Sequence, residues 1–311
     1  MHRPRAALAL VLSLASLGAA SGCRRGGPEP LPVVRVVALE AADATPAELP
    51  GSGLVSPSEL VHAAGEGLRS AGVEVDLSAG QLRRGDFRLR LELLLQHVPP
   101  SVDTDQRGLL RALCRGRLQA LSEGPPLEIA RLDQEAVAEK VYRGPPPGRS
   151  DWVAHARRTA RDTAAALGRQ VRLLSADRAT LLGVLRHKDS DNDLRMVAMQ
   201  ILGARRDREA LPALFEMLKH PDMEVRDRAI GALIEIGDRR AVKALASSAQ
   251  FSDTFELGKI LEAVATLGGP EARSYLEFVA SGHQSEQIRA EARVALSHLE
   301  RRERDGGAQG P

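Results

Sequence analysis

The stretches LRMVAMQILGARRDREALPAL (residues 194–214) and VRDRAIGALIEIGDRRAVKAL (residues 225–245) repeat one pattern of apolar and charged residues. A third copy, ELGKILEAVATLGGPEARSYL (residues 256–276), follows at the same offset, and IRAEARVALSHL (residues 288–299) follows after one extra residue. The matching apolar columns are Leu202, Leu233, Val264 and Leu296; Ala210, Ala241 and Ala272; and Leu214, Leu245 and Leu276. A constant period with two apolar helical stripes predicts an α-solenoid, because each helix pair buries its stripes only against its neighbours.

The second copy resembles the HEAT-like repeats first described in phycobilisome lyases, and the resemblance covers roughly residues 179–300. The residues that carry it are Asp222, Val225, Arg226, Ala229, Leu233, Gly237, Asp238, Ala241 and Leu245. The resemblance implies packing roles for Arg195, Arg226, Arg289, Asp207 and Asp238, with the two aspartates capping second helices. The third copy departs from the pattern, with Leu257 for the arginine and Gly269 at the turn. The family includes lyases, adaptors and scaffolds, so the resemblance implies a fold and no particular reaction.

The chain before residue 144 predicts a small α+β domain with the order strand, helix, three strands. Apolar and charged residues alternate in DFRLRLELLLQHV (residues 86–98), which is typical of an antiparallel strand with one solvated face. Ser56 and Glu59 form a capping box that starts the helix. The other strands are expected at residues 31–40, 108–121 and 127–133.

The N-terminus has the features of an export signal that ends at a cysteine. MHRPR is basic, AALALVLSLASLGAA is apolar, and small residues precede Cys23. This arrangement resembles the lipobox of bacterial lipoproteins, although Ala20 stands where leucine is usual. The resemblance implies that Cys23 becomes the acylated first residue of a protein at the outer membrane, facing the periplasm. An ordinary secretory signal that leaves Cys23 a free thiol is the alternative, and a cytoplasmic adaptor with a spurious signal is another.

A change in composition at GPPPGRS (residues 144–150) separates the two predicted domains. A helix expected over residues 151–174 either covers the sheet or begins the helical array, and we assign it to the array. The predicted organisation is a signal peptide at 1–22, a lipidated tether at 23–31, an α+β domain at 32–143, a linker at 144–150, a HEAT-like domain at 151–303 and a disordered tail at 304–311.

Composition narrows the range of partners. The chain has 43 basic and 41 acidic residues, and removal of the signal with Arg3 and Arg5 makes these numbers equal. A neutral protein with 3% aromatic residues is not expected to bind nucleic acid. Cys114 lies in an alternating apolar run and is interpreted as a small buried hydrophobe, so no disulfide is expected.

The sequence lacks a local catalytic motif, and we expect no catalytic residues, cofactor or metal. DSDNDL begins like a calcium loop at Asp189, but Leu194 and Gln200 replace the glycine and glutamate that the loop requires, so a capped turn is the better interpretation. We therefore expect a membrane-anchored, non-enzymatic protein-binding scaffold or assembly factor. The alternative is a HEAT-like repeat lyase or another envelope enzyme, whose site is built from distant residues.

Two basic clusters are candidate binding surfaces. Arg239, Arg240 and Lys243, on the second helix of the second repeat, would bind an acidic segment of another protein. Five arginines of the sheet would either bind an anion or lie on a solvated face neutralised by nearby acids. These five are Arg88, Arg90, Arg111, Arg115 and Arg117.

Overall fold

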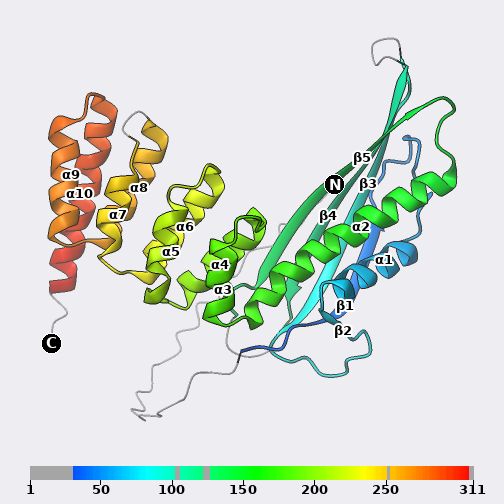
Figure 1. The fold of residues 1–311 in the computed structure, drawn as a ribbon, viewed down its shortest axis with the longest axis horizontal. Coiled ribbons are helices and arrows are strands. Elements are labelled where there is room, and N and C mark those ends of the chain that lie inside the picture. Colours follow the sequence, from blue (N-terminus) through cyan, green and yellow to red (C-terminus); the bar gives the residue numbers. More distant parts are fainter. Residues whose placement is uncertain (1–30, 102–105, 122–126, 251–252, 308–311) are drawn as a thin grey trace, which may run out of the picture. The chain divides into compact units, whose positions relative to one another are not determined.

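The computed structural model describes residues 31–101, 106–121, 127–250 and 253–307, and the chain from Leu31 onward forms one compact unit (Figure 1). Its first part is a five-stranded sheet with two helices, which we call the sheet layer. Its second part, over the same described ranges, is a series of eight helices, α3 to α10, which we call the repeat array.

The sheet layer contains β1 (Arg35–Asp43), α1 (Pro57–Ser70), β2 (Glu74–Val75), β3 (Asp86–Val98), β4 (Arg107–Ala120), β5 (Arg131–Arg143) and α2 (Arg149–Arg172). The repeat array contains α3 (Arg178–Arg186), α4 (Asn192–Ala204), α5 (Leu211–Met217), α6 (Met223–Ile236), α7 (Ala241–Ser248), α8 (Thr254–Leu267), α9 (Pro270–Gly282) and α10 (Glu286–Gly307). Short 3-10 turns at Leu173–Ser175 and Arg208–Ala210 precede α3 and α5.

The strand order is β2-β1-β3-β4-β5. β3, β4 and β5 form the antiparallel meander that the alternating sequence predicts, whereas β1 pairs in parallel with both β2 and β3. Parallel neighbours need a long crossover, and α1 supplies it. The sequence does not predict β2, which has only two residues. The last strand, expected at residues 127–133, lies later in the chain and runs from Arg131 to Arg143.

Local capping fixes α1 as the sequence predicts. The Glu59 amide donates to Ser56 Oγ at 3.3 Å, and the Ser56 amide donates to Glu59 Oε2 at 2.9 Å. Pro57 takes the first helical position, and Gly72 just beyond the helix has a φ of 77° that favours glycine.

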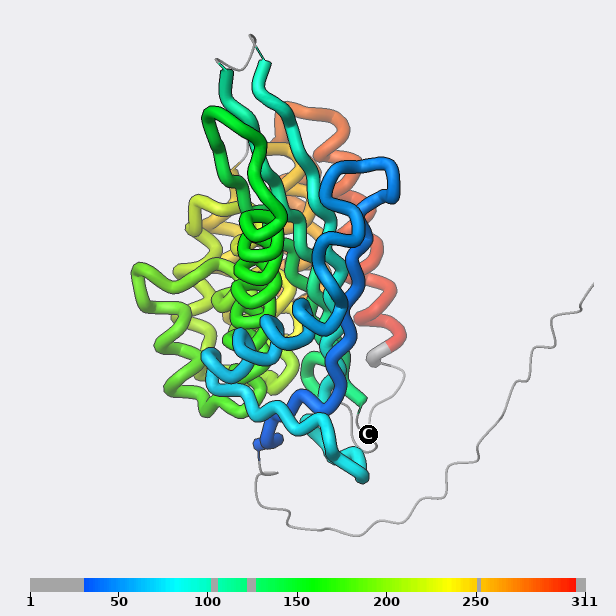
Figure 2. Tube along the Cα trace, turned by 90° about the vertical axis from the view of Figure 1, so that its right-hand side faces the viewer, coloured from blue at the N-terminus to red at the C-terminus, as the bar shows by residue number. Residues whose placement is uncertain are grey.

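Both α1 and α2 cover one face of the sheet (Figures 1 and 2), and α2 contacts α1, β4 and β5. Residues 151–172 therefore belong to the sheet layer. The prediction from sequence places them in the HEAT-like domain at residues 151–303, and the structure corrects this boundary. The apolar stripe of α2, with Ala156, Ala160, Ala164 and Leu167 fully buried, is one face as predicted, but its partner is a sheet. Periodicity shows that a face is buried and leaves open what covers it.

The repeat array stacks successive helix pairs at the predicted period. Leu202, Leu233 and Val264 are all fully buried, whereas Leu296 in the terminal helix is only partly buried because no further described repeat covers it. Aspartates cap three first helices at that same period, namely Asp191 for α4, Asp222 for α6 and Asp253 for α8. The Asp191 cap confirms that DSDNDL is a capped turn.

In the part of the chain that the structure describes, none of the helices has the length and apolar character needed to span a membrane.

Candidate functional site

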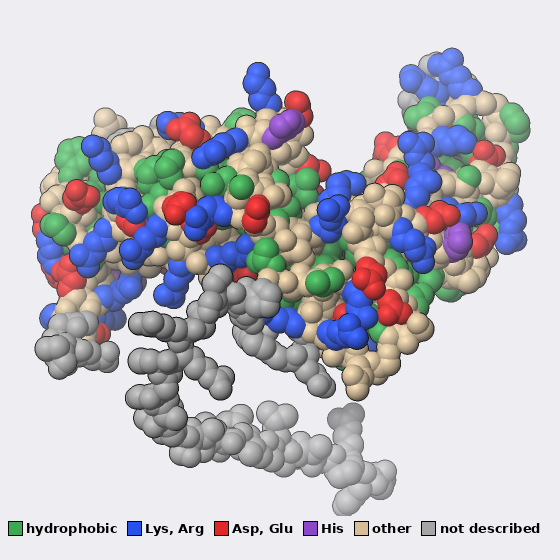
Figure 3. All heavy atoms as spheres, turned by 60° about the horizontal axis from the view of Figure 1, so that its bottom comes forward, with side chains coloured by type: hydrophobic (Ala, Val, Ile, Leu, Met, Phe, Trp, Pro, Cys, Tyr) green, Lys and Arg blue, Asp and Glu red, His purple; other side chains and the backbone are tan. Residues whose placement is uncertain are grey.

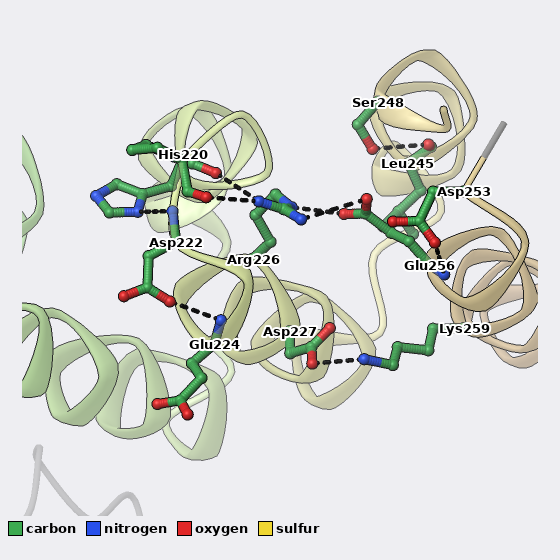
Figure 4. A network of polar contacts seen from close by, with 11 residues as sticks. His220, Asp222, Glu224, Arg226, Asp227, Leu245, Ser248, Asp253, Glu256 and Lys259 are labelled. Carbon is green, nitrogen blue, oxygen red and sulfur yellow. Dashed lines mark hydrogen bonds and ion pairs between the residues drawn. The ribbon is translucent and has the colours of Figure 1, made fainter. Parts of the chain in front are cut away.

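The repeat arginines tie each first helix to the turn that precedes it. Arg226 Nη1 donates to the carbonyl oxygens of His220 and Pro221, at 2.9 and 3.0 Å (Figure 4). Arg195 and Arg289 make the same kind of contact in their repeats. The acceptors are the carbonyls of His187 and Lys188 for Arg195, and of His283 and Gln284 for Arg289. These arginines stabilise turns and leave little donor capacity for a ligand.

Charged pairs also join neighbouring repeats. Arg226 Nε lies 2.6 Å from Glu256 Oε1, and both side chains are largely buried. Lys259 Nζ lies 2.6 Å from Asp227 Oδ2, so two ion pairs connect α6 with α8 (Figure 4). Leu257 replaces the arginine in the third repeat, yet this repeat is joined through Glu256 and Lys259. The sequence pattern does not reveal the partner Glu256, because the other copies have an apolar residue at its position, namely Leu194, Val225 and Ile288.

Asp207 accepts from the Glu209 amide in the 3-10 turn before α5, and Asp238 accepts from the Arg240 amide just before α7, so both stabilise the turns that lead into the second helices. Each also pairs with an arginine of the preceding repeat, Asp207 with Arg178 and Asp238 with Arg208. The Arg240 guanidinium, followed by its own amide, lowers the pKa of Asp238 to about 2. Both aspartates are therefore structural carboxylates.

Arg239, Arg240 and Lys243, which are predicted to bind a partner, differ in whether an acidic residue of this chain already pairs with them. Arg240 is occupied by Asp238, with Nη2 to Oδ2 at 2.7 Å. Arg239 and Lys243 are exposed and form no ion pair within the described part of the chain. Arg239 passes over Gly269, because a Cβ there would lie 3.1 Å from Arg239 Cδ. Of the three predicted cations, Arg239 and Lys243 are therefore the two without an ion pair in the described chain.

A groove of about 830 Å³ lies between α8 and α10. Ala265, Ala290 and Ala295 are small residues in its lining, and Gly258 lets the Glu291 side chain approach so closely that a Cβ there would lie 2.9 Å from Glu291 Oε2. Leu261 lies in its floor, and Val294 is 55% exposed in its wall. We call this feature the α8–α10 groove, and its size is typical of a small-molecule site.

Polar groups gather at the two ends of the α8–α10 groove. At one end Gln287 Nε2 donates to Glu291 Oε1 at 3.0 Å, and at the other Arg302 Nη1 donates to the Thr266 carbonyl at 2.6 Å. His298 and Arg301 add basic groups beside Arg302. From residue 287 to residue 302 the helix rises about 22 Å. The groove therefore suits an elongated molecule with an apolar body and an acidic end.

The sequence alone does not predict a site at this groove. Its lining comes from two helices that α9 separates along the chain, and only stacking brings them together. The one available signal was Gly258 in the middle of a helix, since glycine there usually has a packing reason.

The arginines on the open face of the sheet are neutralised, as the solvated-face alternative expects. Facing residues of β4 and β5 pair across the strands, as in Arg115 with Glu135 at 2.7 Å and Arg117 with Asp133 at 2.8 Å. Arg111 pairs with Glu139, and Arg88 and Arg90 share Glu40. An anion would have to displace these carboxylates.

Of the two cysteines, only Cys114 lies within the described residues, and Cys23 lies outside them. Cys114 is buried against α2, and burial raises the pKa of its thiol to about 11, which makes the thiolate scarce at neutral pH. Within the described ranges, no group of three or more His, Cys, Asp or Glu residues could hold a metal ion.

Comparison with known proteins places the repeats. A family model described as HEAT repeats matches residues 179–257. The chain is 35% identical over 100 residues to the bilin biosynthesis protein PecE of Nostoc sp. (strain PCC 7120), covering 32% of this chain and 39% of that protein. It is 36% identical over 100 residues to PecE of Mastigocladus laminosus, covering 32% and 37%. The chain thus spans about two fifths of the length of these curated relatives.

This similarity corrects one prediction. We expected the chain not to be an enzyme, but the relatives are named for a role in bilin biosynthesis, and this contradicts the expectation. The resemblance to repeats of the phycobilisome-lyase type is supported by the same matches. The C-terminal part of this chain is therefore a HEAT-like repeat domain.

Proposed function

We propose that this chain is a lipid-anchored envelope protein with a lyase-like role, and that the α8–α10 groove binds its small-molecule substrate. The groove is the observation that carries the proposal. It combines an apolar lining with polar groups at both ends, and it lies between two stacked helices of the repeat array. Sites of this construction orient a ligand through a few polar contacts and bind it through apolar area.

The nature of the relatives suggests the class of substrate. They are named for bilin biosynthesis, and a bilin is an open-chain tetrapyrrole pigment with propionate carboxylates on its two central rings. Arg301 and Arg302 line the groove and supply guanidinium groups that can pair with such carboxylates. Ala290 and Val294 are exposed in the groove and supply apolar contact.

Titration with biliverdin tests this assignment, with the change in visible absorbance and the induced circular dichroism as readouts. Ala290 is exposed in the groove wall, so Ala290→Trp fills the space and should weaken binding at least about tenfold. Ser297→Trp places the same ring on the same helix outside the groove and should change binding less than about twofold. Equal binding by both variants, or no binding by the unmodified chain, would remove the groove as the site.

The anchor is a separate part of the proposal and is supported by the sequence around Cys23. In cells grown with labelled palmitate, the unmodified chain should incorporate label and Cys23→Ser should not. Acyl chains contribute about 0.8 kcal/mol per buried methylene, so the lipidated chain should remain with membranes. Label in the Cys23→Ser variant would contradict the anchor.

We also propose that an acidic segment of another protein binds at Arg239 and Lys243. The two exposed cations have no carboxylate partner in the described chain, so a partner would not need to break an ion pair. Arg240 is left out of this surface because Asp238 occupies it.

A further inference from the structure

Four of the exposed large aliphatic side chains belong to two segments at one end of the sheet layer. Leu31 and Val33 are 43% and 72% exposed and begin the described chain. Leu77 and Leu82 are 54% and 46% exposed in the loop between β2 and β3. Exposed aliphatic side chains are unfavourable in water, and a group of them indicates a surface that binds something.

Backbone contacts place these two segments together. Arg35 N donates to the Gly85 carbonyl at 2.9 Å, and Arg35 also pairs with Asp76 and Asp86, which lie at the two ends of the loop. Gly85 is so close to the first segment that a Cβ would lie 2.2 Å from the Val33 carbonyl oxygen. The loop that carries Leu77 and Leu82 is thus fastened to the segment that carries Leu31 and Val33, at the lower end of the sheet in both ribbon and tube (Figures 1 and 2).

Basic side chains border this cluster. Arg83 is exposed next to Leu82. Leu31 also lines a depression together with Arg178 and Arg206, which holds the carboxylates of Asp177, Asp207 and Glu209 as well. Arg178 pairs with Asp207 and Glu209, whereas Arg206 has no carboxylate partner within the described ranges. Figure 3 brings this lower face forward and shows Lys and Arg side chains interspersed with hydrophobic and acidic ones. Exposed aliphatic side chains with Arg83 and Arg206 beside them match the surface of a bilayer that carries anionic phospholipids.

The short stretch of chain between Cys23 and Leu31 favours a bilayer as the partner of this surface. Leu31 is the eighth residue after Cys23, and a stretch of that length spans at most about 28 Å when fully extended. A lipid on Cys23 would therefore keep this end of the sheet layer close to the membrane surface, where a soluble protein partner has little room.

We propose that Leu31, Val33, Leu77, Leu82, Arg83 and Arg206 form a membrane face that rests on an anionic bilayer. The inference builds on the lipid anchor of the proposed function. The four aliphatic side chains enter the interfacial region, and the two arginines bind lipid phosphates. Attachment through the anchor and this face together restricts rotation of the protein about its tether, so that one orientation of the repeat array is presented to its partners.

Binding of the unlipidated protein to vesicles tests the membrane face. The protein used is the chain from residue 23 onward with Cys23→Ser, so that no lipid can be attached. Its described part forms a compact unit without the preceding segment. It should sediment with vesicles of phosphatidylglycerol and phosphatidylcholine more strongly than with phosphatidylcholine alone. Leu77→Ser with Leu82→Ser should lower the partition coefficient at least about tenfold, because two exposed aliphatic contacts are lost.

The open face of the sheet supplies a matched control. Val137 and Val141 are 55% and 59% exposed, and Val137→Ser with Val141→Ser should change the partition less than about twofold. Arg83→Gln with Arg206→Gln should reduce binding to the anionic vesicles and leave binding to phosphatidylcholine unchanged. Equal losses in the valine and leucine variants would overturn the proposal, as would absence of vesicle binding. Release of the protein by millimolar inorganic phosphate would show that the arginines bind the free ion instead.

The outcomes separate this face from the anchor. If Cys23 is not labelled by palmitate but the vesicle results are as expected, the membrane face stands and the anchor is wrong. If Cys23 is labelled but the leucine variant binds like the unmodified chain, the anchor stands and the membrane face is wrong.

Discussion

Leu233→Ala is expected to lower the free energy of unfolding by about 2 to 5 kcal/mol, the range for a buried leucine whose loss leaves a cavity. Leu233 is fully buried in α6, in the middle of the repeat array. Each repeat is stabilised by its neighbours, so a cavity in the second repeat weakens its contacts with both flanking repeats. Urea unfolding followed by circular dichroism at the helical band measures the effect.

Met223→Ala is the matched control for this variant. Met223 belongs to the same helix and is 47% exposed, so its truncation should cost less than about 0.5 kcal/mol. The single tryptophan, Trp152, lies on α2 in the sheet layer and provides a second probe. Leu233→Ala should lower the urea midpoint of unfolding measured by the helical signal more than the midpoint measured by Trp152 fluorescence. For Leu233→Ala, a cost below about 0.5 kcal/mol would show that the repeat register is wrong.

Gly67→Ala is expected to destabilise the sheet layer by about 3 kcal/mol or more, at or beyond the usual range for overpacking. A Cβ on Gly67 would lie 2.1 Å from the Arg161 carbonyl oxygen and 3.0 Å from the Ala165 amide nitrogen. Both neighbours are backbone atoms of α2, which cannot rotate away as a side chain could. The two helices would have to separate, and unfolding followed by Trp152 fluorescence should report the loss.

Gly183→Ala is the same chemical change and is expected to raise the free energy of unfolding instead of lowering it. Gly183 lies in α3, and a Cβ added there would meet nothing within 4 Å, so alanine introduces no clash. Alanine has the higher helix propensity, and the variant should gain up to about 1 kcal/mol. If Gly67→Ala were as stable as the unmodified chain, the close approach of α1 and α2 would be incorrect.

Much of the local structure follows directly from sequence. The capping box of Ser56 and Glu59 is a contact between residues three apart, so sequence alone predicts where α1 starts. The constant offset between Leu202, Leu233 and Val264 likewise predicts the array, because each helix pair must bury its stripes against the next copy. The alternation in residues 86–98 predicts a strand with one solvated face, and the arginines on that face are solvated and paired.

The tertiary structure decided which surfaces meet. The apolar stripe of α2 is equally compatible with a sheet or another helix, and only the packing against β4, β5 and Gly67 selects the sheet. The parallel pairing of β1 depends on a crossover through α1, which strand patterns do not encode. The α8–α10 groove and the cluster around Leu31 and Leu82 join residues far apart in the chain. Such sites arise from distances between elements, and periodicity within a single element carries no information about those distances.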